Sequence, residues 1–300
     1  MARFTKTLKN ALTENGINFT SVKTDSGNDT DRIVMPDGGL MTLPLKPGNT
    51  KTGKKCYGFS TLPTDRTFLI PHINVIQEIK GTCKLTCSDC DGKDTCYGTK
   101  GHYTHMNVKI SLANNTILAY YYLDFLYRLL KAQLSTFKPG TIVRIHITGD
   151  FFSIAYVEMW KTLIKEFPAL RFWSYTKTEF EHAFDDLGNA NIVKSNIPGF
   201  GFNYGHIDYL LSLYIFLVET GKKPFICPCG VDDKKHCTDC KICLDYEYVL
   251  FIEHSTDYDA KKDEMYSFVC EIVNAQDGKN FTELVNRIYA YLGNIENKAA

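Results

Sequence analysis

Residues 141–178 read TIVRIHITGDFFSIAYVEMWKTLIKEFPALRFWSYTKT and predict a strand, a helix and a second strand in succession. The segments 141–147 and 171–178 are short and rich in β-branched or aromatic residues, which is typical of strands buried in a parallel sheet. Between them, Ser153 is a suitable helix cap, and apolar residues recur at helical spacing up to Pro168. This unit favours a parallel sheet or barrel built from strand–helix–strand repeats.

Further segments extend the alternation in both directions. The expected elements are a first strand at 67–76, a helix capped by Asn114 or Asn115 and ending near Leu134, a strand at 191–197 and a buried helix at 209–218. The last of these runs is too short to span a membrane. We therefore expect an α/β fold, a partial or degenerate (β/α) TIM-type barrel with parallel strands, followed by a C-terminal cysteine-rich metal loop.

Three regions are expected along the chain. Residues 1–66 form an N-terminal extension, and residues 67–226 form the barrel-like core. Residues 227–300 hold a cysteine-rich metal region, a last strand and C-terminal helices. A chain of 300 residues with 44% hydrophobic content can bury a core of this size.

Charge and cysteine content limit the functional classes. Lys plus Arg and Asp plus Glu both number 34, so no overall field recruits nucleic acid. Nine of the 11 cysteines cluster in two groups, and no signal peptide precedes them. We expect a reducing compartment, the cytoplasm (of the host cell if the protein is phage-encoded), with cysteines as metal ligands. Cys56 lies outside both groups and is expected to be an unliganded thiol.

The first group lies in a loop at residues 81–98, GTCKLTCSDCDGKDTCYG. Its Cys83, Cys87 and Cys90 are spaced Cys-x3-Cys-x2-Cys, so three thiolates can converge on one metal centre. Cys96 follows as a candidate fourth ligand.

The second group lies at residues 226–243, ICPCGVDDKKHCTDCKIC. Cys237, Cys240 and Cys243 are spaced Cys-x2-Cys-x2-Cys, and either Cys227 or Cys229 supplies a fourth thiolate. Such a run with an adjacent proline favours an iron–sulfur cluster over zinc, which usually takes two separated pairs.

Polar residues follow two of the predicted strands directly. They are Thr148, Gly149 and Asp150 after the first, and Tyr175, Thr176 and Lys177 at the end of the second. Because function gathers at the carboxyl ends of parallel strands, we expect both groups to share one edge with the first cysteine loop. Asp150 is alternatively only a turn former or a helix cap. His146 is expected to be a histidine of the core.

These motifs carry two resemblances. The first cysteine loop behind a strand resembles the cluster loop of radical S-adenosylmethionine enzymes, and Thr148-Gly149-Asp150 resembles their Gly-rich acidic motif. Residues from about 80 to 255 resemble the phage "gene product 88" family. The shared features are Cys96-Tyr97-Gly98, RIHITGDFFS with Trp160 following, FWSYTKT, the second cysteine group and VLFIEH.

The resemblance to radical enzymes implies a specific chemistry. Cys83, Cys87 and Cys90 would hold a four-iron four-sulfur cluster with one iron open to S-adenosylmethionine. The Thr148–Asp150 turn would hold the methionyl ammonium, with Tyr175 and Lys177 nearby. Reductive cleavage, fed by an electron donor, would yield a 5′-deoxyadenosyl radical that removes hydrogen from an unknown substrate. The second cysteine group would be an auxiliary cluster.

Two other interpretations stay open. The chain is alternatively a non-catalytic phage protein that uses iron–sulfur or zinc centres to staple loops and binds a host protein or nucleic acid. The third is a zinc hydrolase or nuclease with Cys96, His102 and His105 as ligands. Closure of the first cluster by Cys96 would favour the non-catalytic interpretation.

Overall fold

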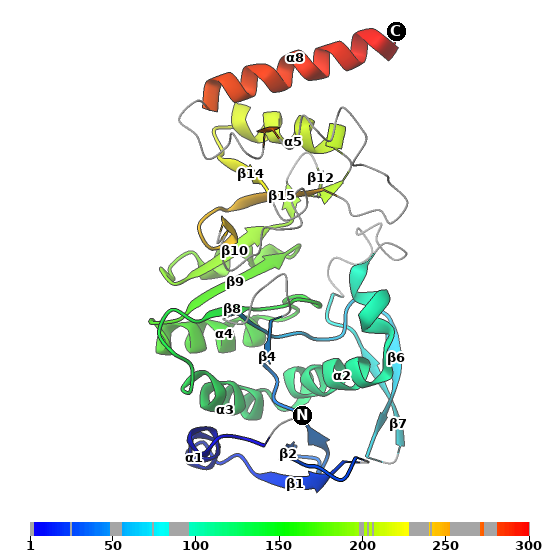
Figure 1. Ribbon diagram of the computed structural model, residues 1–300, viewed down its shortest axis with the longest axis vertical. Coiled ribbons are helices and arrows are strands. Elements are labelled where there is room, and N and C mark those ends of the chain that lie inside the picture. Colours follow the sequence, from blue (N-terminus) through cyan, green and yellow to red (C-terminus); the bar gives the residue numbers. More distant parts are fainter. Residues whose placement is uncertain are drawn as a thin grey trace. The chain divides into compact units, whose positions relative to one another are not determined.

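The computed structural model describes residues 3–24, 26–48, 56–73, 75–83, 96–197, 201–202, 204–205, 207–227, 240, 242–252, 271–272 and 281–299. The fold is mixed α/β with several small sheets (Figure 1). The chain divides into two compact units. Unit 1 comprises Met1–Gly48 and Lys55–Ala190, and unit 2 comprises Asn49–Lys54 and Asn191–Ala300. The expected region boundaries at 66 and 226 therefore fall inside these units.

A mostly parallel sheet forms the centre of unit 1. Its strands are β4 (Lys46–Pro47), β5 (Cys56–Gly58), β8 (Ile142–Arg144) and β9 (Arg171–Thr176), in the order β9-β8-β5-β4. β5 and β9 both run parallel to β8, and β4 is antiparallel to β5. Val143 and Phe172 are fully buried, as expected for strands covered by helices. The strands predicted at 141–147 and 171–178 are confirmed, with shorter bounds.

Three helices pack side by side below this sheet in Figure 1. They are α2 (Met106–Tyr121), α3 (Leu123–Leu134) and α4 (Ile154–Glu166). Ser153 caps α4 as predicted, because its hydroxyl accepts a hydrogen bond from Tyr156 N at 3.3 Å. A short 3₁₀ helix, η3 (Glu179–Phe184), follows β9.

The helix predicted from Asn114 or Asn115 to Leu134 is wrong at its start. Both asparagines are buried inside α2, and a break at Tyr122 separates α2 from α3. Asn115 instead donates from Nδ2 to Ser60 O at 2.8 Å, which ties α2 to the segment after β5. The pattern suggested a cap because asparagine prefers helix ends, but a tertiary hydrogen bond decided its place.

The strand predicted at 67–76 is confirmed over Thr67–His72 only. This run belongs to an antiparallel hairpin of β6 (Thr67–His72) and β7 (Val75–Lys80). The first parallel strand is β5, which is only three residues long. Apolar β-branched residues fit either kind of strand, so the pattern could not separate them.

Residues before β4 also belong to unit 1. They form α1 (Lys6–Glu14) and a small antiparallel sheet of β1 (Phe19–Lys23), β2 (Asp29–Val34) and β3 (Leu40–Met41). α1 packs against α3, and Leu12 and Ile33 are fully buried.

Unit 2 contains a second parallel sheet, ordered β13-β15-β14. Its strands are β13 (Tyr204–Gly205), β15 (Tyr248–Ile252) and β14 (Pro224–Ile226), and its helices are α5 (Ile207–Glu219), η5 (Ile242–Leu244) and α8 (Phe281–Ala299). β10 (Ala190–Lys194) begins at the unit boundary, and β11 (Asn196–Ile197) pairs with β12 (Gly201–Phe202). α5 confirms the buried helix predicted at 209–218, since it supplies half of the described residues of a core that includes Ile288 of α8.

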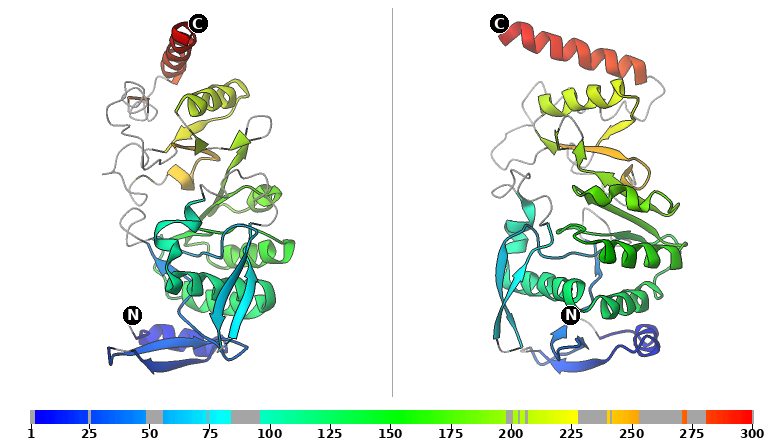
Figure 2. Two further views of the ribbon diagram at one scale, coloured as in Figure 1. Left: turned by 90° about the vertical axis from the view of Figure 1, so that its right-hand side faces the viewer. Right: turned by 180° about the vertical axis from the view of Figure 1, so that it is seen from behind.

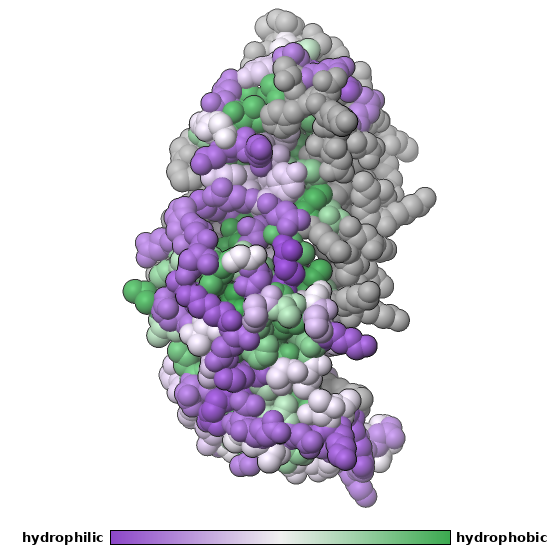
Figure 3. Space-filling model, turned by 90° about the vertical axis from the view of Figure 1, so that its left-hand side faces the viewer, coloured by the Kyte–Doolittle hydropathy of each residue, from purple (hydrophilic) through white to green (hydrophobic). Residues whose placement is uncertain are grey.

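Hydrophilic residues prevail on the face of the molecule shown in Figure 3. Among the described residues, no helix combines the length and the apolar character needed to cross a membrane.

Candidate functional site

The carboxyl edge of the parallel strands in unit 1 gathers a set of buried threonines. Thr61 follows β5 and Thr148 follows β8, and each binds the backbone of the other. Thr61 N donates to Thr148 O at 3.1 Å, and Thr148 Oγ1 donates to Thr61 O at 2.8 Å. Both side chains are at least 97% buried. These bonds fix the two strand extensions side by side.

Thr82 joins this edge to the first cysteine loop. Its hydroxyl lies 2.8 Å from Thr61 Oγ1 and accepts a hydrogen bond from Asp150 N at 3.1 Å. The next residue, Cys83, donates its backbone N–H to Thr64 O at 3.1 Å. The loop therefore starts directly against the Thr148–Asp150 turn.

The other end of the loop returns to the same place. Gly98, in η1 (Tyr97–Thr99), packs so closely that an added Cβ would lie 3.0 Å from Pro63 Cβ and 3.1 Å from Thr148 Cγ2. Cys96, two residues earlier, accepts hydrogen bonds at its carbonyl from the backbone and the hydroxyl of Thr99. Both ends of the segment 84–95 are thus linked to the Thr148–Asp150 turn.

Gly149 is required by the packing of this edge. Its φ of +86° favours glycine, and a Cβ here would lie 1.9 Å from Thr61 Oγ1 and 2.5 Å from Thr82 Oγ1. The turn and the start of the cysteine loop can approach this closely only because position 149 has no side chain.

Asp150 is buried at this edge of the sheet, and both of its carboxylate oxygens accept hydrogen bonds. It is 5% exposed, and Oδ1 accepts hydrogen bonds from Thr176 Oγ1 at 2.7 Å and Phe151 N at 2.8 Å. Oδ2 accepts from Lys177 N at 3.0 Å. Burial raises the pKa of Asp150 from 3.8 to about 6, although these hydrogen bonds oppose the shift. The carboxylate joins the ends of β8 and β9 in the manner of a buried cap.

The three segments expected to share one edge are therefore adjacent among the described residues. Thr148–Asp150 contacts both the start of the cysteine loop and the Thr176–Lys177 segment. Tyr175 and Lys177 are half-buried at this edge.

Arg144 is a residue that the pattern analysis did not select. It lies on the same face of the sheet as Trp173 and Tyr175, and its guanidinium carbon is 4.8 Å and 5.0 Å from the two ring centroids. Tyr103, in η2 (Gly101–Thr104), lies near enough for the Arg144 charge to affect its pKa. A charged residue within the apolar run TIVRIHI was the available signal.

His146 is a core histidine, as predicted. It is 2% exposed, and its Nε2 lies 2.9 Å from Tyr156 Oη. Burial lowers its pKa to about 3, so the ring is neutral. Its backbone φ is +56°, and no partner for Nδ1 exists among the described residues.

The predicted cysteine ligands fall partly within the described residues. Cys83, Cys96, Cys227, Cys240 and Cys243 are half-buried. Cys87, Cys90, Cys229 and Cys237 lie outside the described residues.

Backbone bonds anchor the second cysteine group within unit 2. Cys227 N donates to Leu250 O at 2.8 Å beside β15, and Cys243 O accepts from Asn191 Nδ2 at 2.9 Å. Cys56 is buried in β5, as expected for a cysteine outside the two groups.

The structure gives no support to the third interpretation, a zinc site of Cys96, His102 and His105. Both histidine rings are exposed, with centroids 5.7 Å apart, and no set of three metal-ligating side chains converges among the described residues. Sequence spacing alone could not show this.

Comparison with known proteins supports one of the two resemblances. The family described as "Gene product 88" matches residues 43–198, more than half of the chain. The Gene 88 protein of Mycobacterium phage D29 is 33% identical over 85 residues, which cover 24% of this chain and 35% of that protein.

A second relative is the Gene 88 protein of Mycobacterium phage L5. It is 43% identical over 42 residues, which cover 14% of this chain and 18% of that protein. The matches thus span about a third or less of each curated relative. No solved structure matches the chain. The match over residues 43–198 includes the first cysteine loop and the Thr148–Asp150 turn, and the chain belongs to the gene product 88 family.

Proposed function

We propose that the chain is an iron–sulfur protein whose first cluster is held by Cys83, Cys87 and Cys90 at the carboxyl edge of the unit 1 sheet. One observation carries this proposal. Both ends of the cysteine loop are pinned to the Thr148–Asp150 turn, by Thr82 Oγ1 on one side and by Gly98 on the other. Loop ends fixed this close together suit a segment that folds around a metal centre.

Radical S-adenosylmethionine chemistry is the finer form of the proposal. It is supported by the order along the chain, in which β5 precedes the cysteine loop, α2 and α3 follow, and β8 leads into the Gly-containing acidic turn. When bound, such a cluster supplies the electron for reductive cleavage of S-adenosylmethionine and so starts hydrogen abstraction from a substrate. A partial (β/α) barrel remains the fold proposed for this site.

The residues at this edge fit S-adenosylmethionine, but Asp150 has a different role from the one that the resemblance to radical enzymes implies. Because its carboxylate oxygens already accept three hydrogen bonds from the chain, Asp150 does not fit as a direct ligand of the methionyl ammonium. It acts as a positioning residue, and the backbone carbonyls of the turn are the groups we assign to the ammonium. Tyr175 and Lys177 stay candidates at the mouth of the site.

Tyr120 lies close enough to Cys83 for a thiolate charge there to affect its pKa. Tyr120 donates to Gly81 O at 3.0 Å, and burial, together with the charge of a Cys83 thiolate, raises the pKa of Tyr120 to about 12. The phenol therefore stays neutral beside the thiolate at physiological pH. A neutral phenol adds no second negative charge beside a metal-bound thiolate.

The second candidate function is a metal-stapled binding protein without catalysis. The backbone anchors of Cys227 and Cys243 in unit 2 favour a structural centre for the second cysteine group. In this alternative, iron–sulfur or zinc centres only fix the loops, and a host protein or nucleic acid is the partner.

Anaerobic purification with iron, sulfide and zinc quantified separates the candidates. We expect iron and sulfide in the wild type, loss of one cluster in Cys87→Ala and of the other in Cys237→Ala, and no change in the control Cys56→Ala. With dithionite and S-adenosylmethionine, 5′-deoxyadenosine should form in the wild type and in Cys96→Ala, but not in Cys87→Ala. Zinc alone, or a cluster that leaves S-adenosylmethionine intact, would favour the stapled binding protein.

A further inference from the structure

Arg32 lies on one face of the small sheet of β1, β2 and β3. This sheet forms the blue lower end of unit 1 in both views of Figure 2. Its other face turns toward α1, because Asp31 of β2 accepts a hydrogen bond from Phe4 N at 2.8 Å and lies 2.9 Å from Lys9 Nζ. Side chains alternate along a strand, so the side chain of Arg32 points away from α1. We call this side of the sheet the Arg32 face.

Lys46 of β4 is linked to the Arg32 face through Thr42. The register of β2 and β3 pairs Ile33 with Met41. The next pair along the two chains is Arg32 with Thr42, and residues directly opposite each other place their side chains on the same face. The ammonium of Lys46 donates a hydrogen bond to Thr42 Oγ1. Two cations therefore flank one hydroxyl group.

The described chain supplies no counter-charge to Lys46. Its side chain is half-buried, and none of the described carboxylates forms an ion pair with it. Burial and the charge of Arg32 lower the pKa of Lys46 to about 8, and no acidic group opposes this shift. The ammonium is still charged at neutral pH. A half-buried cation beside a second cation is unfavourable, and a bound anion would stabilise both.

Acidic residues are also absent from the sequence around Lys46. Positions 38–64 contain this lysine and three others, but no aspartate or glutamate. The remaining residues of the three strands on the Arg32 face are uncharged, and they are Thr20, Val22, Thr30, Val34 and Leu40. A positive charge without nearby acidic groups attracts anions.

Hydroxyl groups accompany the two cations on this face. Thr20 is exposed directly opposite Arg32, and Thr30 lies two residues before Arg32. The Thr30 hydroxyl is buried and has no hydrogen-bond partner within the described part of the chain. Because an unpaired buried hydroxyl is costly, the face has hydrogen-bonding capacity that the described chain does not use.

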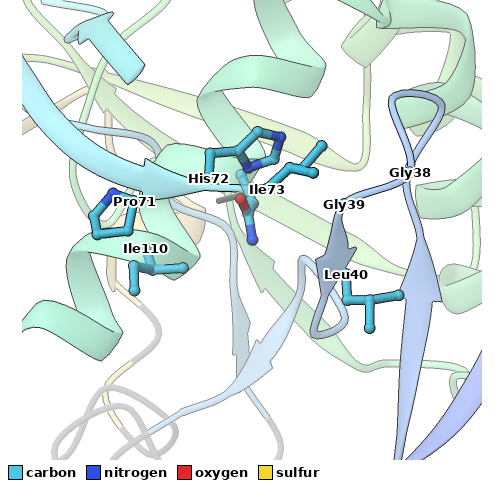
Figure 4. A pocket seen from close by; sticks show the side chains of 8 residues that line it. Gly38, Gly39, Leu40, Pro71, His72, Ile73 and Ile110 are labelled. Atoms are coloured by element: carbon cyan, nitrogen blue, oxygen red, sulfur yellow. The ribbon is translucent and has the colours of Figure 1, made fainter. Parts of the chain in front are cut away.

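The pocket of unit 1 is a separate place. It lies between the Gly38–Gly39 turn, the end of β6 and α2 (Figure 4). None of the eight described residues that line it is a lysine or an arginine. An anion is therefore expected at the two cations and not in this pocket.

We propose that Arg32, Lys46 and Thr42 bind a phosphate group. The guanidinium and the ammonium neutralise its charge and donate hydrogen bonds to its oxygens. Because Thr42 Oγ1 accepts from Lys46, its own hydrogen can be donated to a phosphate oxygen. The phosphate belongs either to a small phosphorylated molecule or to the backbone of a nucleic acid, since both present the same oxygens. The site uses no residue of the cysteine loops, so it does not depend on the proposed iron–sulfur function.

Phosphate titration of the full chain tests the site. We expect inorganic phosphate, titrated past about 1 mM at constant ionic strength, to shift the backbone N–H signals of Thr42 and Lys46 saturably in NMR spectra. Chloride at the same ionic strength should leave these signals unchanged. Equal shifts with chloride, or no saturable shift with phosphate, overturn the proposal.

A single strand of about ten deoxythymidines distinguishes the two sources of the phosphate. Binding at least tenfold tighter than that of inorganic phosphate, weakened by added salt, assigns the site to a nucleic acid. Binding of inorganic phosphate without tighter binding of the strand assigns it to a small phosphorylated molecule. Both results support the site.

Matched variants separate binding from folding. Lys46→Gln and Arg32→Gln should each weaken phosphate binding at least tenfold, because each removes a charged donor. Lys23→Gln is the control, since Lys23 is exposed on the α1 side of the same sheet, and it should bind like the wild type. Urea unfolding checks that each variant is folded. Wild-type affinity in folded Lys46→Gln or in folded Arg32→Gln contradicts the assignment.

Discussion

At the level of single residues, Asp150 shows how this edge combines burial with charge. Its carboxylate is 5% exposed and accepts three hydrogen bonds, yet burial still raises its pKa from 3.8 to about 6. A group whose pKa is higher in the folded state stabilises the fold below its unfolded pKa, and this contribution is lost as pH rises through the folded pKa. The cost of an ionised Asp150 therefore appears between pH 4 and pH 7.

We predict that the free energy of unfolding of unit 1 falls over this range by about 3 kcal/mol because of Asp150, as a pKa change from 3.8 to about 6 implies. Asp150→Asn should remove this part of the pH dependence of the free energy of unfolding. The variant should also be destabilised at pH 4 by about 1 to 3 kcal/mol, because an amide N–H would face a backbone donor. Urea unfolding followed by fluorescence reports unit 1, which contains both tryptophans, Trp160 and Trp173.

The control for this pH dependence is Asp124→Asn on the exposed face of α3. It should keep the slope of the wild type. The pKa of Asp31 is lowered to about 2, mainly by the Ser21 hydroxyl. Its protonation therefore changes the free energy of unfolding below pH 4, outside the range from pH 4 to pH 7. An identical slope in Asp150→Asn and the wild type would contradict the burial argument.

At the level of elements, local pattern predicted the strand–helix–strand unit of β8, α4 and β9. Its strands are buried by helices and its helix has a side-chain cap, so sequence and structure agree there. The pattern failed for β5 because three residues carry no periodicity. It also merged α2 with α3, since the break at Tyr122 follows no glycine or proline.

The candidate site was predicted in outline but not in its contacts. Asp150 and the loop ends were named from the rule that function gathers at strand carboxyl ends. Thr61 and Thr82, which hold the edge together, were not named, because a threonine in a connecting segment gives no signal of its own. The inward direction of the Asp150 carboxylate depends on tertiary packing, which no local pattern encodes.

The turn after β8 gives a prediction at this scale. Gly149→Ala should destabilise unit 1 by about 3 kcal/mol or more, since it adds a clash with Thr61 and Thr82 to the strain of a positive φ. Gly140→Ala is the matched control, because Gly140 has a φ of +77° and open space around its Cβ position. It should cost about 1 to 2 kcal/mol. Equal losses in urea unfolding would mean that the turn is not tightly packed on the cysteine loop.

At the level of the whole molecule, the chain holds two separate cores. Unit 1 is organised by its parallel sheet and α2 to α4, whereas the core of unit 2 is built from α5, β14, β15 and α8. The first cysteine loop belongs to unit 1 and the second group to unit 2. If each unit forms its own cooperative core, damage to one core should leave the other folded.

Ile288 of α8 tests this independence. It is fully buried in the core of unit 2, so Ile288→Ala should destabilise that unit by about 2 to 5 kcal/mol. Hydrogen exchange should then accelerate in α5 and β15 but stay unchanged in β8 and β9, and tryptophan fluorescence should not move. Asn286→Ala, exposed on the same helix, should leave both units unchanged. Faster exchange in β8 and β9 as well would mean that the two cores unfold together, and that metal loss from one cysteine group should then affect both units.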